Sequence, residues 1–586
     1  MSAGGQTSTP IIDTLKRHPL LFGSAVTLPL DTTHTIVIGA GLAGLTTALD
    51  LLDKGHRVDL IDRDDESRFG GLGLHAFGGM ALVDTPLQRL NRIHDSADIA
   101  LADWLAFAEF DATDLWPRRW AEHYIQRCVP EVYEWLGHRG LHFIPAVQWV
   151  ERGWMTRGNT LPRYHVLWGT SRHMLQTLLK ALRQHPHRGR LNILARHWVD
   201  GLIGHAYGIH GCHGVHEADG SGFELHADAV VVATGGITGD LRRVRQHWPA
   251  DWGTAPSTLL NGSHPHADGR LHDAVSTIGG AVTHLDQMWN YAAGVRHPDP
   301  QFPGHGLSLI PAKSALWLDP DGRRIGPVPF VTGFDTHEMV AQIARAQWPW
   351  TWQVLNRRIA EKELAASGAD HNPHIRDRRL PALMWQMLRG NRELVDELVN
   401  QCPDVIVADD LAELAGRMNR LCGDQRISAD GLLAQIQPYD DQIRRGPRLH
   451  NDDQLRRIEQ LRRWPGDRFR TCRYQPVLDP AAGPLMAIRC QLLTRKSTGG
   501  IQTDLQSRVL DLRGQPIAGL YAVGEAAGFG GGGSNGRKSL EGTFLSSCIL
   551  TAHAAARHIQ SGAVQSTGWM APSQHSTPVA ATRRHA

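Results

Sequence analysis

The stretch from residue 35 to residue 62 constrains the fold of this chain more than any other. An apolar run at 35–38 precedes Gly39-Ala-Gly41-Leu-Ala-Gly44, an apolar segment at 45–54 and a second apolar run at 57–61 that ends in Asp62. This order predicts a strand, a tight turn, a helix and a second strand, with Gly41 where a pyrophosphate approaches. Asp62 lies where a carboxylate can bind a ribose hydroxyl. The stretch therefore predicts a dinucleotide-binding unit.

Small residues elsewhere in the chain indicate which dinucleotide is bound. Gly78-Gly79 follows the second strand, a buried strand at 229–233 ends in Thr234-Gly235-Gly236, and Gly524-Glu525 lies near the C-terminus. An NAD-binding domain is normally one contiguous block, whereas contacts spread from one end of the chain to the other suit extended FAD. There is no second GxGxxG unit for a nicotinamide, so a quinone or another protein is the expected electron acceptor.

The C-terminal stretch 519–548 reads as strand, glycine-rich loop and helix. An apolar run at 520–523 ends in Gly524-Glu525, four consecutive glycines occupy 530–533, and an apolar helix follows. Glycine permits positive φ and close backbone approach, so we expect the run to approach a ligand. A flexible linker is the alternative, but strand and helix patterns closely bracket the run. The amides at the helix start predict a site for the partial negative charge at N1 and O2 of a reduced flavin.

Composition excludes several classes of function. The chain has 586 residues, 41% of them hydrophobic, and its net charge of +2 indicates no nucleic-acid-binding surface. Its seven cysteines are scattered without a CxxC pair, which is typical of reduced thiols in a cytoplasm. The 33 histidines show no metal-ligand spacing, so we expect no metal. Without a signal pattern or an uninterrupted apolar run long enough to span a bilayer, the sequence predicts a cytoplasmic protein with no transmembrane segment.

Together these features resemble a flavoprotein family that includes fumarate reductase and succinate dehydrogenase flavoprotein subunits and 3-ketosteroid Δ1-dehydrogenases. Within it the chain looks most like the FAD-binding dehydrogenase branch that is compared with steroid Δ1-dehydrogenases. The stretches that carry the resemblance are 77–86, 102–104, 116–121, 149–153, 168–170, 286–289, 494–504 and 528–545.

The resemblance implies an α/β fold, with a Rossmann-like FAD-binding domain interrupted by an inserted α+β capping domain that binds substrate. We place the first FAD-binding segment at 34–290, the capping domain at 291–484 and the second FAD-binding segment at 485–560. Residues 1–33 are interpreted as an N-terminal arm. Residues 561–586 are rich in Ser, Pro, Ala, Thr and His and are interpreted as a disordered tail.

The FAD-binding residues are predicted from the glycine motifs and the strand ends. They are Gly39, Gly41, Leu42, Ala43, Gly44, Asp62, Arg63, Gly78, Gly79, Ala233, Thr234, Gly235, Gly524, Glu525, Gly542, Thr543 and Phe544. Succinate dehydrogenases attach FAD covalently through a histidine upstream of a Gly-Gly pair. His75 lies too close to Gly78 for that motif, so we predict noncovalent FAD.

The resemblance also locates the candidate catalytic residues. Lys496 stands where fumarate reductases have a substrate-binding histidine, and Ser539 where they have a proton-donating arginine. Both departures argue against a dicarboxylate substrate, and the tyrosine-bearing glycine motif of true 3-ketosteroid dehydrogenases is not evident. The candidates are Lys496 and Arg489 as carbonyl donors, Arg495 beside them, and Tyr291 and Tyr164 as acid/base phenols.

The leading functional hypothesis is an FAD-dependent dehydrogenase acting on CH–CH bonds next to a carbonyl, with hydride transfer to flavin N5. A 3-ketosteroid-like, apolar ketone is the best specific substrate, because a minority of the 18 tryptophans could line a pocket for a flat apolar molecule. Alternatives are a fumarate-reductase-like ene-reductase acting on another unsaturated acid or ketone, and a flavin-carrying electron-transfer subunit.

Overall fold

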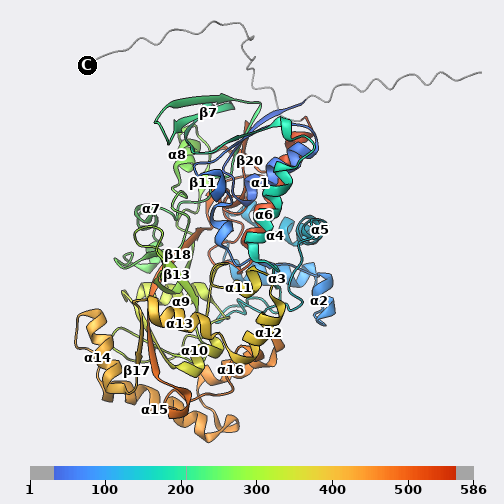
Figure 1. Cartoon of the computed structure of the whole chain (residues 1–586). Helices are drawn as coiled ribbons and strands as arrows, with labels where there is room; N and C mark the ends of the chain where they lie inside the picture. The colour runs from blue at the N-terminus through green and yellow to red at the C-terminus, as the bar shows by residue number, and fades with distance from the viewer. Residues whose placement is uncertain (1–31, 206, 563–586) are drawn as a thin grey trace, which may run out of the picture. The chain divides into compact units, whose positions relative to one another are not determined.

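A six-stranded sheet combines strands from the two ends of the chain. A computed structural model describes residues 32–205 and 207–562 (Figure 1). In it β1 (His34–Ile38) pairs in parallel with β2 (Arg57–Ile61) and β9 (Ala229–Val232), and β21 (Pro516–Ala522) pairs in parallel with β9. The outer strands are β5 (Leu191–Leu194) and the antiparallel β20 (Arg508–Leu510). The C-terminal segment therefore completes a sheet that the N-terminal segment begins.

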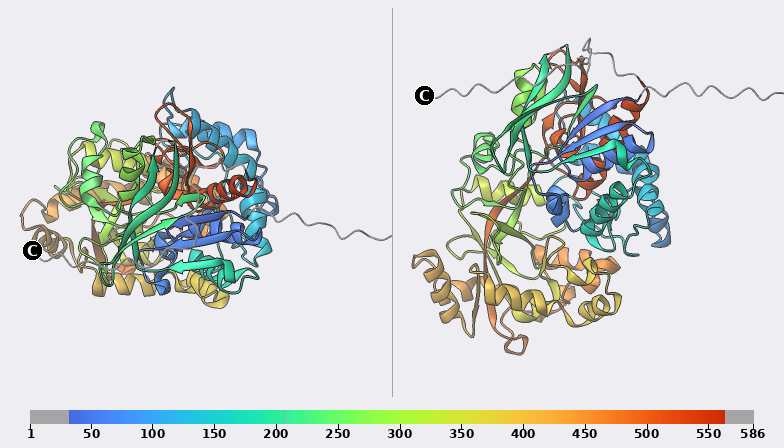
Figure 2. Two further views of the ribbon diagram at one scale, coloured as in Figure 1. Left: turned by 90° about the horizontal axis from the view of Figure 1, so that it is seen from above. Right: turned by 45° about the horizontal axis from the view of Figure 1, so that its top comes forward.

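Different layers cover the two faces of this sheet. Ile36 and Ile38 pack with a three-stranded sheet of β6 (His197–His205), β7 (Gly208–His216) and β8 (Gly222–His226). Val37 and Leu60 pack on the other side with helices α1 (Leu42–Asp53), α6 (Thr170–Arg183) and α18 (Thr543–Gln560). Figure 2 shows the green three-stranded sheet on one side of the blue strands and the helices on the other. Burial on both faces explains why these parallel strands are continuously apolar.

A second, eight-stranded sheet is built around the long strand β18 (Leu485–Ser497). β18 pairs in antiparallel fashion with β12 (Met288–Arg296), β15 (Thr351–Asn356) and β17 (Val405–Ala408). The other strands are β10 (Leu260–Asn261), β13 (Gly306–Ile310), β14 (Leu316–Leu318) and β16 (Ala365–Ala366). The helices that share its hydrophobic core are α9 (Thr336–Arg345), α10 (Arg357–Glu363), α13 (Arg392–Gln401), α14 (Leu411–Cys422), α15 (Ala429–Arg445) and α16 (Asp453–Arg463).

Further helices and strands complete the fold. They include β3 (Gly79–Ala81), β4 (Tyr164–Val166), α2 (Pro86–Leu90), α3 (Ala97–Ala108), α4 (Leu115–Cys128), α5 (Glu134–His138), α8 (Arg270–Thr277), α11 (Pro373–Arg376), α12 (Leu380–Arg389) and α17 (Pro465–Phe469). No helix among the described residues is both long enough and apolar enough to cross a membrane.

The predicted α/β fold class is confirmed, and the strand predicted at 57–61 coincides with β2. The first helix begins at Leu42 rather than at 45, because Gly41 is its extended N-cap and Gly44 already lies in its first turn. The predicted domain limits at 290 and 484 remain predictions. β12 and β18 both belong to the second sheet, so residues 288–290 and 485–497 join that sheet rather than the six-stranded one. The predicted arm at 1–33 and tail at 561–586 lie outside the described residues, except for 32–33 and 561–562.

Candidate cofactor and substrate pocket

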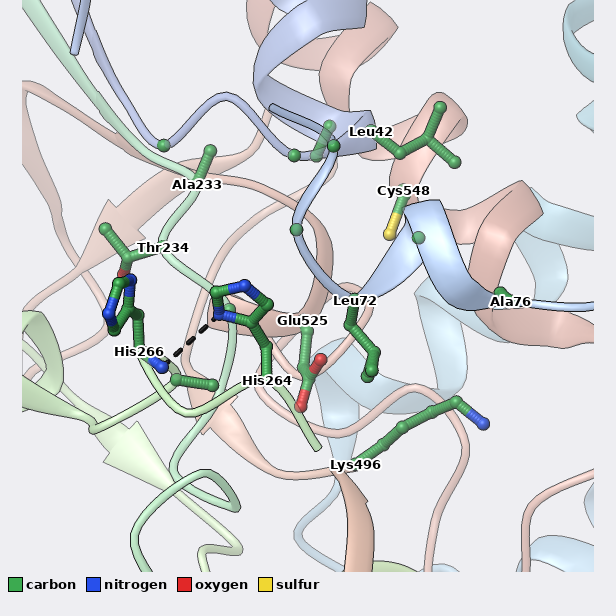
Figure 3. Close-up of a pocket in the computed structure, with 18 of the residues that line it drawn as sticks. Leu42, Leu72, Ala76, Ala233, Thr234, His264, His266, Lys496, Glu525 and Cys548 are labelled. Carbon is green, nitrogen blue, oxygen red and sulfur yellow. Dashed lines mark hydrogen bonds between the residues drawn. The ribbon is translucent and has the colours of Figure 1, made fainter. Parts of the chain in front are cut away.

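One pocket collects the ends of the parallel strands of the first sheet. Its lining includes Gly39 after β1, Asp62 after β2, Ala233 after β9 and Glu525 after β21. The carboxyl ends of parallel strands are where α/β sheets bind their ligands. Figure 3 shows Ala233, Thr234, Glu525 and Lys496 around this pocket.

The glycines of the first turn fit a bound diphosphate. A Cβ on Gly39, whose φ is +109°, would lie 2.4 Å from the Ala233 carbonyl oxygen, and one on Gly44 would lie 1.8 Å from the Gly39 carbonyl oxygen. A Cβ on Gly41 would meet no protein atom within 4 Å. No side chain caps the first turn of α1 at Gly41, so its amides are available to an anion. Gly39 and Gly44 thus shape the turn, and Gly41 leaves room for the ligand.

Acidic and histidine side chains gather beside Asp62. The Asp62 carboxylate accepts hydrogen bonds from the amides of Ala40 and Asp64, and burial raises its pKa. Asp64 Oδ2 lies 3.1 Å from His264 Nε2 and 3.7 Å from His266 Nδ1. The ligand atoms of Asp64, His264 and His266 are close enough together to hold a metal ion. All three line the pocket, so we assign them to its ribose end. No motif marked this cluster, because Asp64 lies far from His264 and His266 in the sequence.

Charged side chains from β18 and from the end of β21 also line the pocket. Glu525 Oε1 accepts a hydrogen bond from the Ser497 amide at 2.9 Å, and burial raises its pKa to about 7. Burial lowers the pKa of Lys496 to about 8, although the nearby Glu541 opposes this shift. The Lys496 ammonium lies 4.1 Å from the centre of the Phe544 ring. Arg495 donates a hydrogen bond to the Gly262 carbonyl.

A tyrosine and a glutamate meet in the same region. The Tyr291 hydroxyl donates a hydrogen bond to Glu541 Oε2 at 2.9 Å, and Trp289 Nε1 donates to the same oxygen at 2.9 Å. Burial, and then the charge of Glu541, raise the pKa of Tyr291 well above its usual value. Tyr164 also lines the pocket, and burial likewise raises its pKa. Sequence analysis assigned no role to Glu541, whose signal was a carboxylate directly before Gly542-Thr543-Phe544.

Most of the predicted cofactor residues lie in the pocket wall. Those that line it are Gly39, Gly41, Leu42, Ala43, Asp62, Arg63, Gly78, Gly79, Ala233, Thr234, Gly235, Glu525 and Phe544. Gly44, Gly524, Gly542 and Thr543 are not in the lining. The first three allow close packing behind it: a Cβ on Gly524 would lie 2.9 Å from Ala43 Cβ, and one on Gly542 would lie 2.8 Å from the Ala81 nitrogen.

Four of the five catalytic candidates line the pocket: Lys496, Arg495, Tyr291 and Tyr164. Arg489 does not. It lies on β18 and donates hydrogen bonds to the fully buried carboxylate of Asp404 at 2.7 and 3.0 Å. Asp404 also binds Arg296, so this ion pair joins neighbouring strands of the second sheet. We therefore leave Arg489 out of the proposed site.

The prediction for the glycine run at 530–533 is wrong. None of these glycines lines the pocket, although Phe529 before them does. A Cβ on Gly530 would lie 2.6 Å from the Trp120 ring, and one on Gly531 would lie 2.7 Å from the backbone of Trp116. All four have positive φ. The run therefore lets the loop pack against α4 rather than against a ligand.

This fold and pocket define an FAD-dependent oxidoreductase. The family model of the FAD binding domain matches residues 34–545, so the chain belongs to that family. It is 40% identical over 545 residues to the KsdD-like steroid dehydrogenase of Mycobacterium tuberculosis. The aligned region covers 90% of this chain and 95% of the relative.

Solved structures show the same fold at lower identity. The 3-ketosteroid Δ1-dehydrogenase of Sterolibacterium denitrificans is 16% identical with a TM-score of 0.63, covering 91% of this chain and 100% of that one. A flavocytochrome c3 fumarate reductase is 18% identical with a TM-score of 0.63, covering 91% of this chain and 79% of that one. Among curated relatives, the 40% identity to a steroid dehydrogenase, against 24% to the fumarate reductase of Schizosaccharomyces pombe, supports the leading hypothesis better than the fumarate reductase alternative.

Gly41→Ala should fold normally but bind FAD at least about tenfold more weakly, since the new methyl group would occupy space needed by the diphosphate. Fluorescence titration of the apoprotein with FAD measures the affinity, and circular dichroism checks the fold. Gly137→Ala is the matched control, because a Cβ there also meets no atom within 4 Å but lies outside the pocket. Equal FAD affinity of the two variants would contradict the assignment of Gly41.

Proposed function

We propose that this dehydrogenase desaturates the bond next to the carbonyl of an apolar, 3-ketosteroid-like ketone. The observation that carries the proposal is the hydrogen bond between Tyr291 and Glu541, in the same pocket as Lys496. Flavin desaturation needs a proton acceptor for the α carbon and a donor for the carbonyl oxygen. These three side chains supply both.

The proton acceptor is Tyr291 acting together with Glu541. Because the pKa of Tyr291 is raised, a standing phenolate is unfavourable. The phenol can instead pass its own proton to Glu541 Oε2 while its oxygen takes the α proton of the substrate. Lys496, as an ammonium, donates a hydrogen bond to the carbonyl oxygen, on which negative charge develops. FAD, when bound, supplies the acceptor for the β hydride.

The lining favours a neutral, apolar substrate. Phe529, Phe544 and Leu545 line the pocket, and the Phe544 ring lies beside the Lys496 ammonium. Ser539, at the position where fumarate reductases carry an arginine, is fully buried and does not line it. The cations Arg495 and Lys496 lie near the carboxylates Glu525 and Glu541, which leaves little excess positive charge for a dicarboxylate.

We extend the proposal to the electron acceptor and the compartment. A quinone or a redox protein accepts the electrons, since the complete dinucleotide-binding pattern of strand, GxGxxG turn, helix and second strand is recognised once in the sequence, at 35–62. A cytoplasmic location is supported by the seven cysteines, all of which are free thiols.

Anaerobic addition of 4-androstene-3,17-dione to the yellow protein should bleach the oxidised flavin. Tyr291→Phe should slow bleaching about 10²- to 10⁴-fold, because it removes the proton acceptor while leaving the ring in place. Stopped-flow absorbance gives the rates, and FAD content must stay unchanged. Tyr207→Phe is the control, since Tyr207 is 88% exposed. A flavin that dithionite reduces but this ketone does not would contradict the substrate assignment.

The rate of bleaching should fall as the pH rises through about 8, because Lys496 then loses the proton with which it donates to the carbonyl. Lys496→Arg should extend the plateau to higher pH. Lys496→Met should lower the rate about 10²- to 10³-fold and remove this limb of the profile. Arg495, Glu525 and Glu541 also face Lys496. If the bleaching rate of Lys496→Met still fell as the pH rose, that fall would be assigned to a group other than Lys496.

We also propose that FAD is held without a covalent bond. The side chain of His75 is half exposed, lies 3.2 Å from Asp370 Oδ2 and does not line the pocket. Acid precipitation should therefore release all the flavin into the supernatant, in the native protein and in His75→Ala alike. A yellow pellet that becomes colourless in His75→Ala would show a covalent bond at this histidine.

A further inference from the structure

The helix α12 (Leu380–Arg389) presents an unusual apolar surface. None of its residues is buried, and Leu380, Met384, Trp385, Met387 and Leu388 are between 37% and 72% exposed. Residues spaced by three, four and seven positions share one face of a helix, so Leu380, Met384, Met387 and Leu388 form a stripe about 12 Å long, with Trp385 at its edge beside Leu388. The other large exposed apolar side chains of the described residues are spread over many elements. Scattered ones need no explanation, but a contiguous stripe marks an interaction surface.

A basic cavity adjoins this stripe. Leu388 and Arg389, at the end of α12, line it together with the exposed ring of Phe469 on α17. Its basic lining residues are Arg357, Arg358, Lys362, Arg389, Arg392, Arg462, Arg468 and Arg473. Arg389 of α12 and Arg462 of α16 line the same cavity, and Figure 1 labels both helices in the same region of the molecule. An apolar stripe and a basic cavity thus form one continuous surface.

Few acidic groups offset this positive charge. Glu361 is the acidic residue of the cavity lining, and it pairs with Arg357 at 2.8 Å and with Arg392 at 3.3 Å. Asp396 and Asp479 pair with Arg357 and Arg358 from outside the lining. Eight basic residues against these three acids leave the surface with a clear positive excess.

The two ends of α12 add to the pattern. Arg378 and Arg379 precede the helix and are exposed. Arg389, in its last turn, stacks on Trp385 with its guanidinium 4.4 Å from the ring centre. Apolar and tryptophan side chains on one face, with arginines around them, are the features of helices that lie in the interface of an anionic bilayer.

We propose that α12 and the adjoining basic cavity dock this enzyme onto the surface of a membrane that contains anionic phospholipids. The apolar stripe inserts among the lipid chains, and the arginines of the cavity bind the phosphate groups. An acidic protein partner would neutralise the positive charge of the cavity, but it would not explain the apolar stripe on α12. The inference does not depend on the substrate proposed above, although apolar ketones and quinones both partition into bilayers.

The test is flotation of the full-length, FAD-loaded protein with two kinds of vesicle. One kind is pure phosphatidylcholine, and the other also contains phosphatidylglycerol, an anionic lipid, at about one lipid in three. We expect the anionic vesicles to bind at least about tenfold more protein than the neutral ones, and 0.5 M salt, where the Debye length is only about 4 Å, to weaken this binding. The double variant Trp385→Gln/Leu388→Gln should lose about tenfold or more in binding. Arg392→Gln/Arg473→Gln should lose the preference for the anionic lipid.

The matched control is Leu90→Gln/Leu512→Gln, which removes two leucines that are 74% and 81% exposed elsewhere. It should bind vesicles like the native protein. Equal recovery on neutral and anionic vesicles, or unchanged binding by Trp385→Gln/Leu388→Gln, would overturn the proposal. A dimer that this double variant converts to monomers, without vesicle binding by the native protein, would assign the stripe to contact between copies of the chain. The bleaching assay on each variant keeps failure of docking distinct from failure of the active site.

Discussion

The hydrogen bonds of Ser497 join the two sheets on which the pocket depends. Ser497 ends β18, the central strand of the second sheet. Its hydroxyl accepts a hydrogen bond from the amide of Ile237, just beyond β9, and its own amide donates to Glu525, just beyond β21. The second sheet is thereby fixed to the carboxyl ends of two strands of the first. Lys496, the preceding residue, is held at the same point, so the proposed carbonyl donor is positioned by the contact that joins the sheets.

The half-buried charges of the pocket form a balanced set. Arg495 and Lys496 come from β18, Glu525 follows β21, and Glu541 precedes α18. Isolated charges are costly to bury, but opposite charges close together offset much of that cost. The charges of Glu541 and Glu525 favour the protonated form of Lys496, yet its pKa falls because the cost of desolvation outweighs their attraction. A neutral ketone would enter this set without adding charge, whereas a dicarboxylate would add two negative charges to an already balanced pocket.

Local patterns predicted the parts of the structure that local interactions determine. The unit from β1 to Asp62 was recognisable because strand, turn, helix and strand are adjacent in sequence. The pair of Tyr291 and Glu541 was not, because those residues lie on either side of β18 and meet only after β12 pairs with it. Arg489 was misplaced for a related reason. Lys496 faces the pocket, but Arg489 lies seven residues earlier on the same strand, a distance of more than about 20 Å, and so reaches a different environment.

The glycine run at 530–533 is required for packing of the loop and not for contact with a ligand. The sequence places 530–533 between the strand and helix that flank the pocket, which suggested contact with the ligand. In the structure, the space that a Cβ on Gly530 or Gly531 would need is occupied by Trp120 and Trp116 of α4, so only glycine fits at these two positions. Trp120 Nε1 also donates to the Asp504 carbonyl, and Trp104 Nε1 donates to the Ser534 carbonyl. These contacts fix the loop that leads to Glu541. The glycines therefore serve the site indirectly, by letting the loop pack closely enough to hold Glu541 against Tyr291.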